Sequence, residues 1–258
     1  MAVQPQRVLN VRRVLLAVAA LICVVVLVGF QVTRPVKAAG SPQVFVPSSH
    51  FYEKLSPSYR TSIADLYWLG IVQYYGEHIV GDRRLDSLPA MLDLVTALSP
   101  RFIEPYLFST FALADAGRPQ TAYDLLERGY RANPRNWRLP YQLGFLAYTY
   151  GQGKETKART AAKWFTMASG LPGRPAFIPR LAAGMLLRGG EREKAILMWG
   201  PIYTDGDKFA RAKAVASLDY LLPKGKDARM KAVVPLYRTM PKAAFQELLA
   251  ELFKGYSP

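Results

Sequence analysis

The chain repeats its pattern of residue sizes at a spacing of 34 residues. Pro100 and Pro134 are 34 residues apart, and each precedes a new segment in which apolar residues recur every three or four positions. From Ser58 onward this spacing is interrupted only by Gly and Pro and never becomes the alternation typical of a β-strand. Each helix pair of such a repeat exposes an apolar face that only the next pair can cover. We therefore predict an all-α stack of three or more helix–turn–helix units.

Residues 103–136 form the clearest unit. It places bulky residues on the first helix, a glycine at the turn, and small residues on either side of a bulky one on the second helix, namely Tyr106, Leu113, Gly117, Ala122, Leu126 and Gly129. This order resembles that of the tetratricopeptide repeat, whose units have the same arrangement and close with a proline. The resemblance implies a helical solenoid whose concave side, lined by the first helix of each unit, is the usual binding surface.

Three further units keep this register less closely. Units 137–175 and 176–209 match at Leu143, Gly144, Ala161, Phe165, Ala168, Ala183, Leu186, Gly190, Ala195 and Trp199. The first of these units carries about five extra residues between its helices, at 151–157. A degenerate unit, 63–102, opens the array with Leu69 and Gly70.

The stack also needs terminal helices with a polar outer face. Helices over 208–222, 226–239 and 241–254 are expected to provide them. The sequence therefore predicts a repeat domain over 58–222 followed by capping helices over 223–258.

The N-terminal region predicts a membrane anchor. Seventeen residues without a charge, 14–30, follow Arg12 and Arg13, and about twenty apolar residues span a bilayer core. We predict a short tail over 1–13, a transmembrane helix over 14–33 and a proline-stiffened linker over 34–57. The alternative is a cleaved signal peptide, whose apolar region would be shorter and whose small-residue cleavage pattern is interrupted by Lys37.

The arginines flanking this span favour a short tail inside the cell and the C-terminal mass outside. In a bacterium, this orientation places the helical domain on the periplasmic side of the inner membrane.

Charge and rare residues limit the function classes. The net charge is +15, with 34 Lys and Arg against 19 Asp and Glu, which points to an anionic partner or surface. One Cys and two His argue against a disulfide framework and against Cys- or His-based metal centres. No nucleophile–base pair, paired carboxylates or phosphate-binding loop stands out, and Glu77–His78 is interpreted as a solvated pair. We therefore predict neither an enzyme nor a cofactor site.

The predicted binding surface combines aromatic rings with arginines on the first helix of each unit. Such residues suit a groove for a peptide or protein, because rings bury area and guanidinium groups pair with carboxylates. The predicted partner-binding residues are Tyr67, Tyr74, Phe111, Arg138, Tyr141, Phe145, Tyr148, Arg180 and Arg188, and Ile71, Tyr75, Leu107 and Leu187 share their side. The alternative is that individual rings pack between helices. The carboxylate clamp of Lys and Asn used by some family members is absent, since its positions hold Tyr, Leu, Ile or Phe.

A second candidate surface is basic. It comprises Lys208, Arg211, Lys213, Lys224, Lys226, Arg229, Lys231, Arg238 and Lys242. Its ordinary interpretation is a solvated helical face, and the functional one is contact with anionic lipid or an acidic protein. Nucleic acid is a third candidate, which placement outside the cytoplasm would exclude.

Together these features predict a non-catalytic, membrane-anchored scaffold or assembly factor that binds a protein of an envelope complex. The alternative is an accessory subunit packed permanently on an integral membrane complex.

Overall fold

The computed structural model describes residues 18, 19, 21, 22 and 57–255. Within 57–255 the chain forms eleven α-helices, one 3-10 helix and no strand. In chain order they are α2 (Pro57–Val80), α3 (Leu88–Leu98), α4 (Ile103–Asp115), α5 (Pro119–Ala132), α6 (Arg138–Tyr150), α7 (Lys154–Ser169), α8 (Phe177–Arg188), α9 (Arg192–Asp205), α10 (Lys208–Leu221), α11 (Lys226–Val233), the 3-10 helix η2 (Val234–Arg238) and α12 (Lys242–Leu252). The predicted all-α class is confirmed for these residues.

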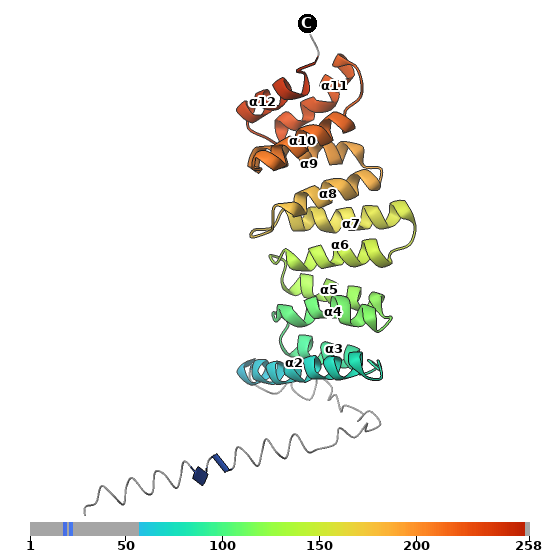
Figure 1. Ribbon diagram of the computed structural model, residues 1–258, viewed down its shortest axis with the longest axis vertical. Helices are drawn as coiled ribbons and strands as arrows, with labels where there is room; N and C mark the ends of the chain where they lie inside the picture. Colours follow the sequence, from blue (N-terminus) through green and yellow to red (C-terminus); the bar gives the residue numbers. More distant parts are fainter. Residues whose placement is uncertain (1–17, 20, 23–56, 256–258) are drawn as a thin grey trace, which may run out of the picture. The chain divides into compact units, whose positions relative to one another are not determined.

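The helices stack in chain order. Each helix from α2 to α10 packs against the next (Figure 1), and α3 also touches α5 and α4 touches α6. The last helices fold back on this stack, because α12 contacts both α9 and α10. The arrangement is the solenoid-like order expected of helix pairs that cover one another's apolar faces.

Small residues are placed where neighbouring helices approach closely. A Cβ atom on Gly129 of α5 would lie 2.6 Å from the Tyr106 ring of α4, and one on Gly144 of α6 would lie 2.7 Å from the Phe165 ring of α7. Ala195 of α9 is fully buried in the same way. The small positions of units 103–136 and 137–175 are therefore required by packing.

Glycine also ends two of the first helices. Gly117, between α4 and α5, has φ +70°, and Gly190, between α8 and α9, has φ +78°. Backbone with positive φ is strained for residues that carry a side chain. At the second turn, the Glu191 N–H returns to the Leu186 carbonyl at 2.8 Å, which closes the end of α8.

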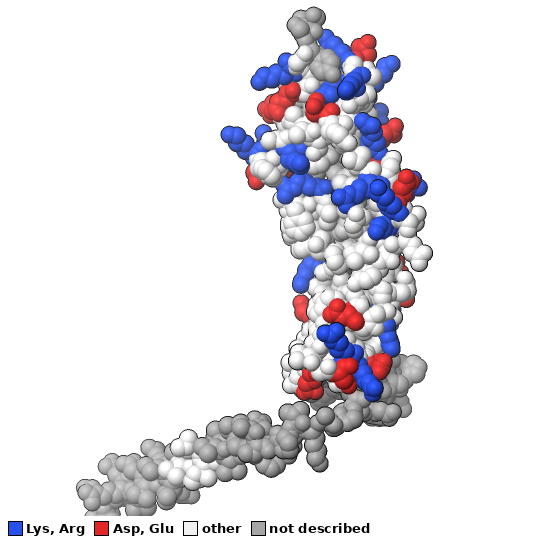
Figure 2. All heavy atoms as spheres, turned by 45° about the vertical axis from the view of Figure 1, so that its right-hand side comes forward, with Lys and Arg blue, Asp and Glu red and all other residues white. Residues whose placement is uncertain are grey.

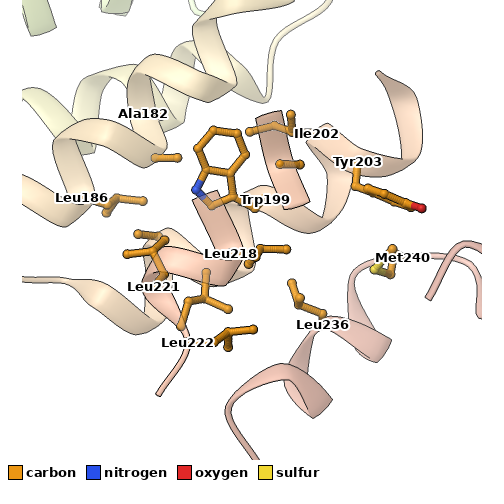
Figure 3. Packing of buried hydrophobic residues seen from close by; sticks show 14 of the residues in the cluster. Ala182, Leu186, Trp199, Ile202, Tyr203, Leu218, Leu221, Leu222, Leu236 and Met240 are labelled. Carbon is orange, nitrogen blue, oxygen red and sulfur yellow. The ribbon is translucent and has the colours of Figure 1, made fainter. Parts of the chain in front are cut away.

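The C-terminal half has one continuous core built around Trp199 of α9. Figure 3 shows this indole close to Ala182 and Leu186 of α8 and to Leu218 and Leu221 of α10. Leu236 and Met240, in and just after η2, belong to the same cluster. The last helices thus complete the hydrophobic core of α8–α10 and are part of the fold.

The opening unit does not keep the predicted register. Leu69 is 60% exposed, and a Cβ atom on Gly70 would meet nothing within 4 Å. The buried side of α2 instead carries Ala64, Ile71 and Tyr74. Because α2 is apolar on both sides, its periodicity does not select the side that packs. The predicted role of Leu69 and Gly70 is wrong.

The predicted insertion at 151–157 is not a loop. Helix α7 already begins at Lys154, so only residues 151–153 separate it from α6. Residues 154–157 form the first turn of α7, which has 16 residues where α5 and α9 each have 14. The prediction that 154–157 lie between the two helices is wrong, since an exposed polar segment can form the first turn of a helix.

Most of the predicted transmembrane helix (14–33) and of the predicted linker (34–57) lies outside the described residues. Among the residues that the structure describes, no helix is both long enough and apolar enough to cross a bilayer.

Candidate binding surface on the even-numbered helices

Exposed large apolar side chains are distributed unequally between the helices. On α4, α6, α8 and α10 they include Phe111, Phe145, Phe177, Phe209 and Tyr220. Across the described helices α3, α5, α7 and α9, Met167 is the sole large apolar residue that is exposed. Burial of apolar area is the main stabilising contribution in such a stack. Large apolar residues that stay exposed on alternate helices therefore indicate a candidate binding surface.

Side-chain contacts connect these helices into one surface. Tyr75 of α2 meets Phe111 of α4 with ring centroids 5.9 Å apart. Glu104 of α4 pairs with Arg138 of α6 at 3.9 Å. We use the name even-helix face for the surface of α2, α4, α6, α8 and α10 that carries Tyr75, Phe111, Phe145, Phe177, Phe209 and Tyr220.

The same contacts continue along the stack. Tyr141 of α6 lies edge-on to Phe177 of α8 at 6.0 Å between centroids. The guanidinium of Arg180 on α8 lies 6.0 Å from the Phe209 ring of α10. Ring–ring, ion-pair and cation–ring contacts thus connect each of these helices to the next along the even-helix face.

Two cations surround the ring of Tyr148. Arg188 donates a hydrogen bond from Nη1 to the Tyr148 hydroxyl at 2.7 Å, and its guanidinium carbon lies 5.6 Å from the ring centroid. The Lys157 ammonium lies 5.1 Å from the same centroid. Such a site presents positive charge beside an aromatic surface, which suits a carboxylate that follows an apolar group.

A tyrosine–carboxylate hydrogen bond ends the face near α2. The Tyr75 hydroxyl donates to Asp115 Oδ2 at 2.7 Å. Burial of the ring, followed by this hydrogen bond and the negative charge of Asp115, raises the pKa of Tyr75 to about 12. The phenol therefore stays protonated at physiological pH, and the interaction acts as a structural link between α2 and α4.

The structure separates the nine predicted partner-binding residues into three groups. Phe111, Arg138, Phe145 and Arg188 are exposed, while Tyr67, Tyr141, Tyr148 and Arg180 are half-buried. Tyr74 is buried, and its hydroxyl donates to the Arg84 carbonyl at 2.9 Å. Ile71 and Leu107, which were expected on the same side, are buried as well. These three residues belong to the core, because the sides of α2 and α4 that carry them face neighbouring helices.

Tyr141 has a mixed position. Its ring lies 5.8 Å from the ring of the buried Phe165 and 6.1 Å from that of Trp137, measured between centroids. A change at Tyr141 would therefore disturb packing as well as the surface, so Phe145 is the better probe of this face.

Three exposed aromatic residues of the face were not predicted. Phe177 lies one turn before Arg180, while Phe209 and Tyr220 lie on α10, which is predicted only as one of the terminal helices with a polar outer face. The signal was present in the sequence, because Phe209, Lys213, Ala216 and Tyr220 have helical spacing. Asp207 fixes the start of this helix, since its carboxylate accepts the Ala210 N–H at 2.7 Å.

The even-helix face is hollowed between α8 and α10. Gly184, Leu187, Lys213, Ala216 and Tyr220 line a hollow of about 320 Å³, together with Ala183, Trp199, Ser217 and Leu221. Two of its neighbouring residues on α8 and α10, Arg180 and Phe209, are already in contact across the helices.

A larger hollow lies on the other side of the stack, between α7 and α9. Met167, Leu197, Met198 and Pro201 supply its apolar lining, and Arg159, Lys163 and Lys194 its cations. Arg159 donates to the Gly189 carbonyl at 2.7 Å, and Lys194 pairs with Glu191. Because the acidic Glu191 belongs to the lining and pairs with Lys194, this hollow is the weaker candidate for an anionic ligand.

One residue of the predicted basic surface is buried in the core. Arg229 is only 4% exposed, pairs with Asp219 and lies 5.8 Å from the Phe253 ring. Arg211 pairs with Glu247 at 3.9 Å. The other basic residues of this surface are exposed. Figure 2 shows Lys and Arg gathered over the upper part of the array on the side it presents, above a band with few charges.

In the Glu77–His78 pair, the contacts of the His78 ring are with its own helix. His78 Nδ1 lies 2.8 Å from the Tyr74 carbonyl of its own helix, and its ring stacks on that of Tyr74. Within the part of the chain that the structure describes, no three His, Cys, Asp or Glu side chains come close enough to hold a metal ion.

No protein-family model matches the chain, and no curated protein sequence matches it either. The fold and the surface alone describe its class: the protein is a stack of α-helical pairs with aromatic and cationic side chains on alternate helices.

Proposed function

We propose that the protein is a non-catalytic scaffold or assembly factor of the tetratricopeptide-repeat type, which binds a segment of another protein on its even-helix face. The observation that carries this proposal is the unequal exposure of large apolar side chains, which are frequent on α4, α6, α8 and α10 and reduced to Met167 on α3, α5, α7 and α9. Contiguous exposed apolar surface on a protein marks an interaction site.

The chemistry of the face supports a protein partner. Phe111 is 50% and Phe145 46% exposed. Across α6, α8 and α10, Arg188 lies beside the Tyr148 ring and Arg180 beside the Phe209 ring. Aromatic residues and Arg are the side chains that most often dominate binding energy at protein interfaces. Their exposed rings lose little conformational freedom on binding because a ring has few rotatable bonds.

The proposed location is the inner membrane of a bacterium, with the helical domain in the periplasm. The support is the uncharged run 14–30 and the arginines before it. We expect the membrane-extracted protein to keep its N-terminal residues, and a reporter fused after Pro258 to be active outside the cytoplasm. N-terminal sequencing and the reporter assay measure these outcomes. A mature N-terminus near Gly40 would contradict the anchor, and a cytoplasmic reporter signal would contradict the orientation.

The binding proposal predicts that Phe145→Ala weakens partner capture while leaving the fold intact. Truncating an interface aromatic typically costs about 2 kcal/mol or more, which is about thirtyfold in affinity. The exposure of Phe145 limits its contribution to the core, so its melting temperature should stay close to that of the wild type. The measurement is quantitative co-purification after cross-linking in membranes, combined with thermal melts.

A photo-reactive amino acid placed at residue 145 provides the positional test. It should form a cross-linked adduct of defined mass, whereas the same group at the exposed Arg131 of α5 should not. Equal capture by Phe145→Ala and wild type, together with adducts only from residue 131, would assign binding to the opposite side and reject the proposal.

The accessory-subunit alternative has one observation in its favour. The outer side of α2 exposes Leu66, Leu69, Val72 and Val80, and a group of exposed large apolar residues is typical of a surface that a neighbour covers. A permanent neighbour would cover this side. Charged substitutions at Leu66 and Leu69 that release the chain from a stable complex would favour this alternative over recruitment by the even-helix face.

A further inference from the structure

We infer that the hollow between α8 and α10 anchors one large apolar side chain of the bound protein segment, and that this segment carries a carboxylate next to that side chain. The inference rests on the proposed function and specifies the chemistry of the partner. The hollow is lined by the apolar side chains of Leu187, Trp199 and Tyr220 and by the cationic Lys213.

The hollow depends on a glycine that packing does not require. Gly184 lies within α8, where glycine is less favourable than alanine. A Cβ atom at Gly184 would meet nothing within 4 Å, whereas one at Gly144 would collide with the Phe165 ring. Gly144 is thus explained by the close approach of two helices. The missing side chain at Gly184 has a different effect, which is to keep the hollow open beside Ala216 of α10.

The size and lining of the hollow suit a single side chain. Its volume of about 320 Å³ is at the lower end of the range for ligand pockets, which are mostly apolar with a few polar groups. Leu187 and Tyr220 are already exposed to solvent. An aliphatic or aromatic side chain placed between them would remove apolar area of both the chain and the partner from water.

The charges around the hollow select an acidic neighbour. Helix α8 contains Arg180 and Arg188 and no acidic residue. The only acidic residue of α10, Asp219, pairs with Arg229. Lys213 of α10 lines the hollow, and Arg180 lies about one turn before Gly184 on α8. These two cations are close enough for a carboxylate beside the anchored side chain to form charge-assisted hydrogen bonds. A partner segment with basic residues at these positions would be repelled.

The test uses the full-length chain in detergent micelles and a synthetic ten-residue peptide as the probe. The peptide carries benzoylphenylalanine at its centre, with Asp and Glu on both sides. After illumination, mass spectrometry should locate the cross-link on residues of α8 or α10 that line the hollow. A peptide with Lys in place of Asp and Glu should cross-link at least about tenfold less at physiological salt, since attraction between opposite charges becomes repulsion.

Gly184→Leu is the decisive variant, because it fills the hollow from within while its Cβ meets open space. It should lower cross-linking at least about tenfold, as expected when an anchoring pocket is lost, with a melting temperature equal to or above that of the wild type. Gly70→Leu is the matched control, since Gly70 is also helical with nothing within 4 Å and lies on α2. Ala216→Leu is a second way to fill the hollow, and Lys213→Glu tests the charge.

The outcomes separate this inference from the proposed function. Cross-links outside α8 and α10, no cross-linking by the wild type, or equal cross-linking by wild type, Gly184→Leu and Ala216→Leu would overturn the anchoring pocket. If Phe145→Ala still reduced capture of the cellular partner in that case, the even-helix face would remain the binding surface. If Phe145→Ala also had no effect, the proposed function would fail as well.

Discussion

Trp199→Ala should lower the free energy of unfolding by about 3–5 kcal/mol, the loss expected when a buried aromatic side chain is removed from a core. Trp199 is 7% exposed and lies in the cluster that joins α8, α9, α10 and η2. Its removal leaves a cavity between helices that cannot collapse without moving the stack (Figure 3). Denaturant unfolding of the full-length chain in detergent, followed by circular dichroism, measures the effect.

Tyr220→Ala is the control for this prediction. Tyr220 lies on the adjacent helix and is 79% exposed, so its loss should change stability by less than about 0.5 kcal/mol. If the two variants unfolded at the same denaturant concentration, the core described around Trp199 would be wrong. The comparison also tests whether the C-terminal helices are part of the core, because Leu236 and Met240 belong to the same cluster as Trp199.

Gly144→Leu should destabilise the fold by about 1–3 kcal/mol or more, because an added side chain overpacks a close helix contact. Its Cβ would lie 2.7 Å from the buried ring of Phe165, and neither α6 nor α7 can move without disturbing its other neighbour. The same substitution at Gly70 should stabilise the chain by up to about 1 kcal/mol, since leucine is the better helix former.

Unfolding curves of the two glycine variants show which of the two glycines lies at a close contact between helices. Opposite signs are expected for Gly144→Leu and Gly70→Leu. A loss of stability in both would mean that the outer side of α2 is covered by another part of the protein. Unchanged stability in Gly144→Leu would mean that α6 and α7 are further apart than described.

The candidate site was only partly predictable from sequence. The 34-residue register identified first-helix positions, and Phe111 and Phe145 are indeed exposed there. It failed for Tyr74, whose hydroxyl bonds the Arg84 carbonyl inside the α2–α3 turn. It also missed Phe209 and Tyr220, because α10 follows a different spacing from the repeat and was treated as part of the end of the stack.

The sequence by itself determined the all-α class of the described residues and the succession of helices along the chain. This is because the spacing of apolar residues and the positions of Gly and Pro act locally, within a few residues of each turn. It also determined the net charge and the uncharged run near the N-terminus, which depend on composition alone.

Only the tertiary structure decided which side of each helix is covered. Helix α2 has apolar residues on both sides, so the position of α3 and α4 determines that Ile71 is buried and Leu69 exposed. Arg229 resembles its basic neighbours in sequence, yet its contacts with Asp219 and Phe253 place it in the interior. The hollow beside Gly184 likewise exists because α8 and α10 come together there. Such features depend on contacts between residues far apart in the chain, and local periodicity carries no information about them.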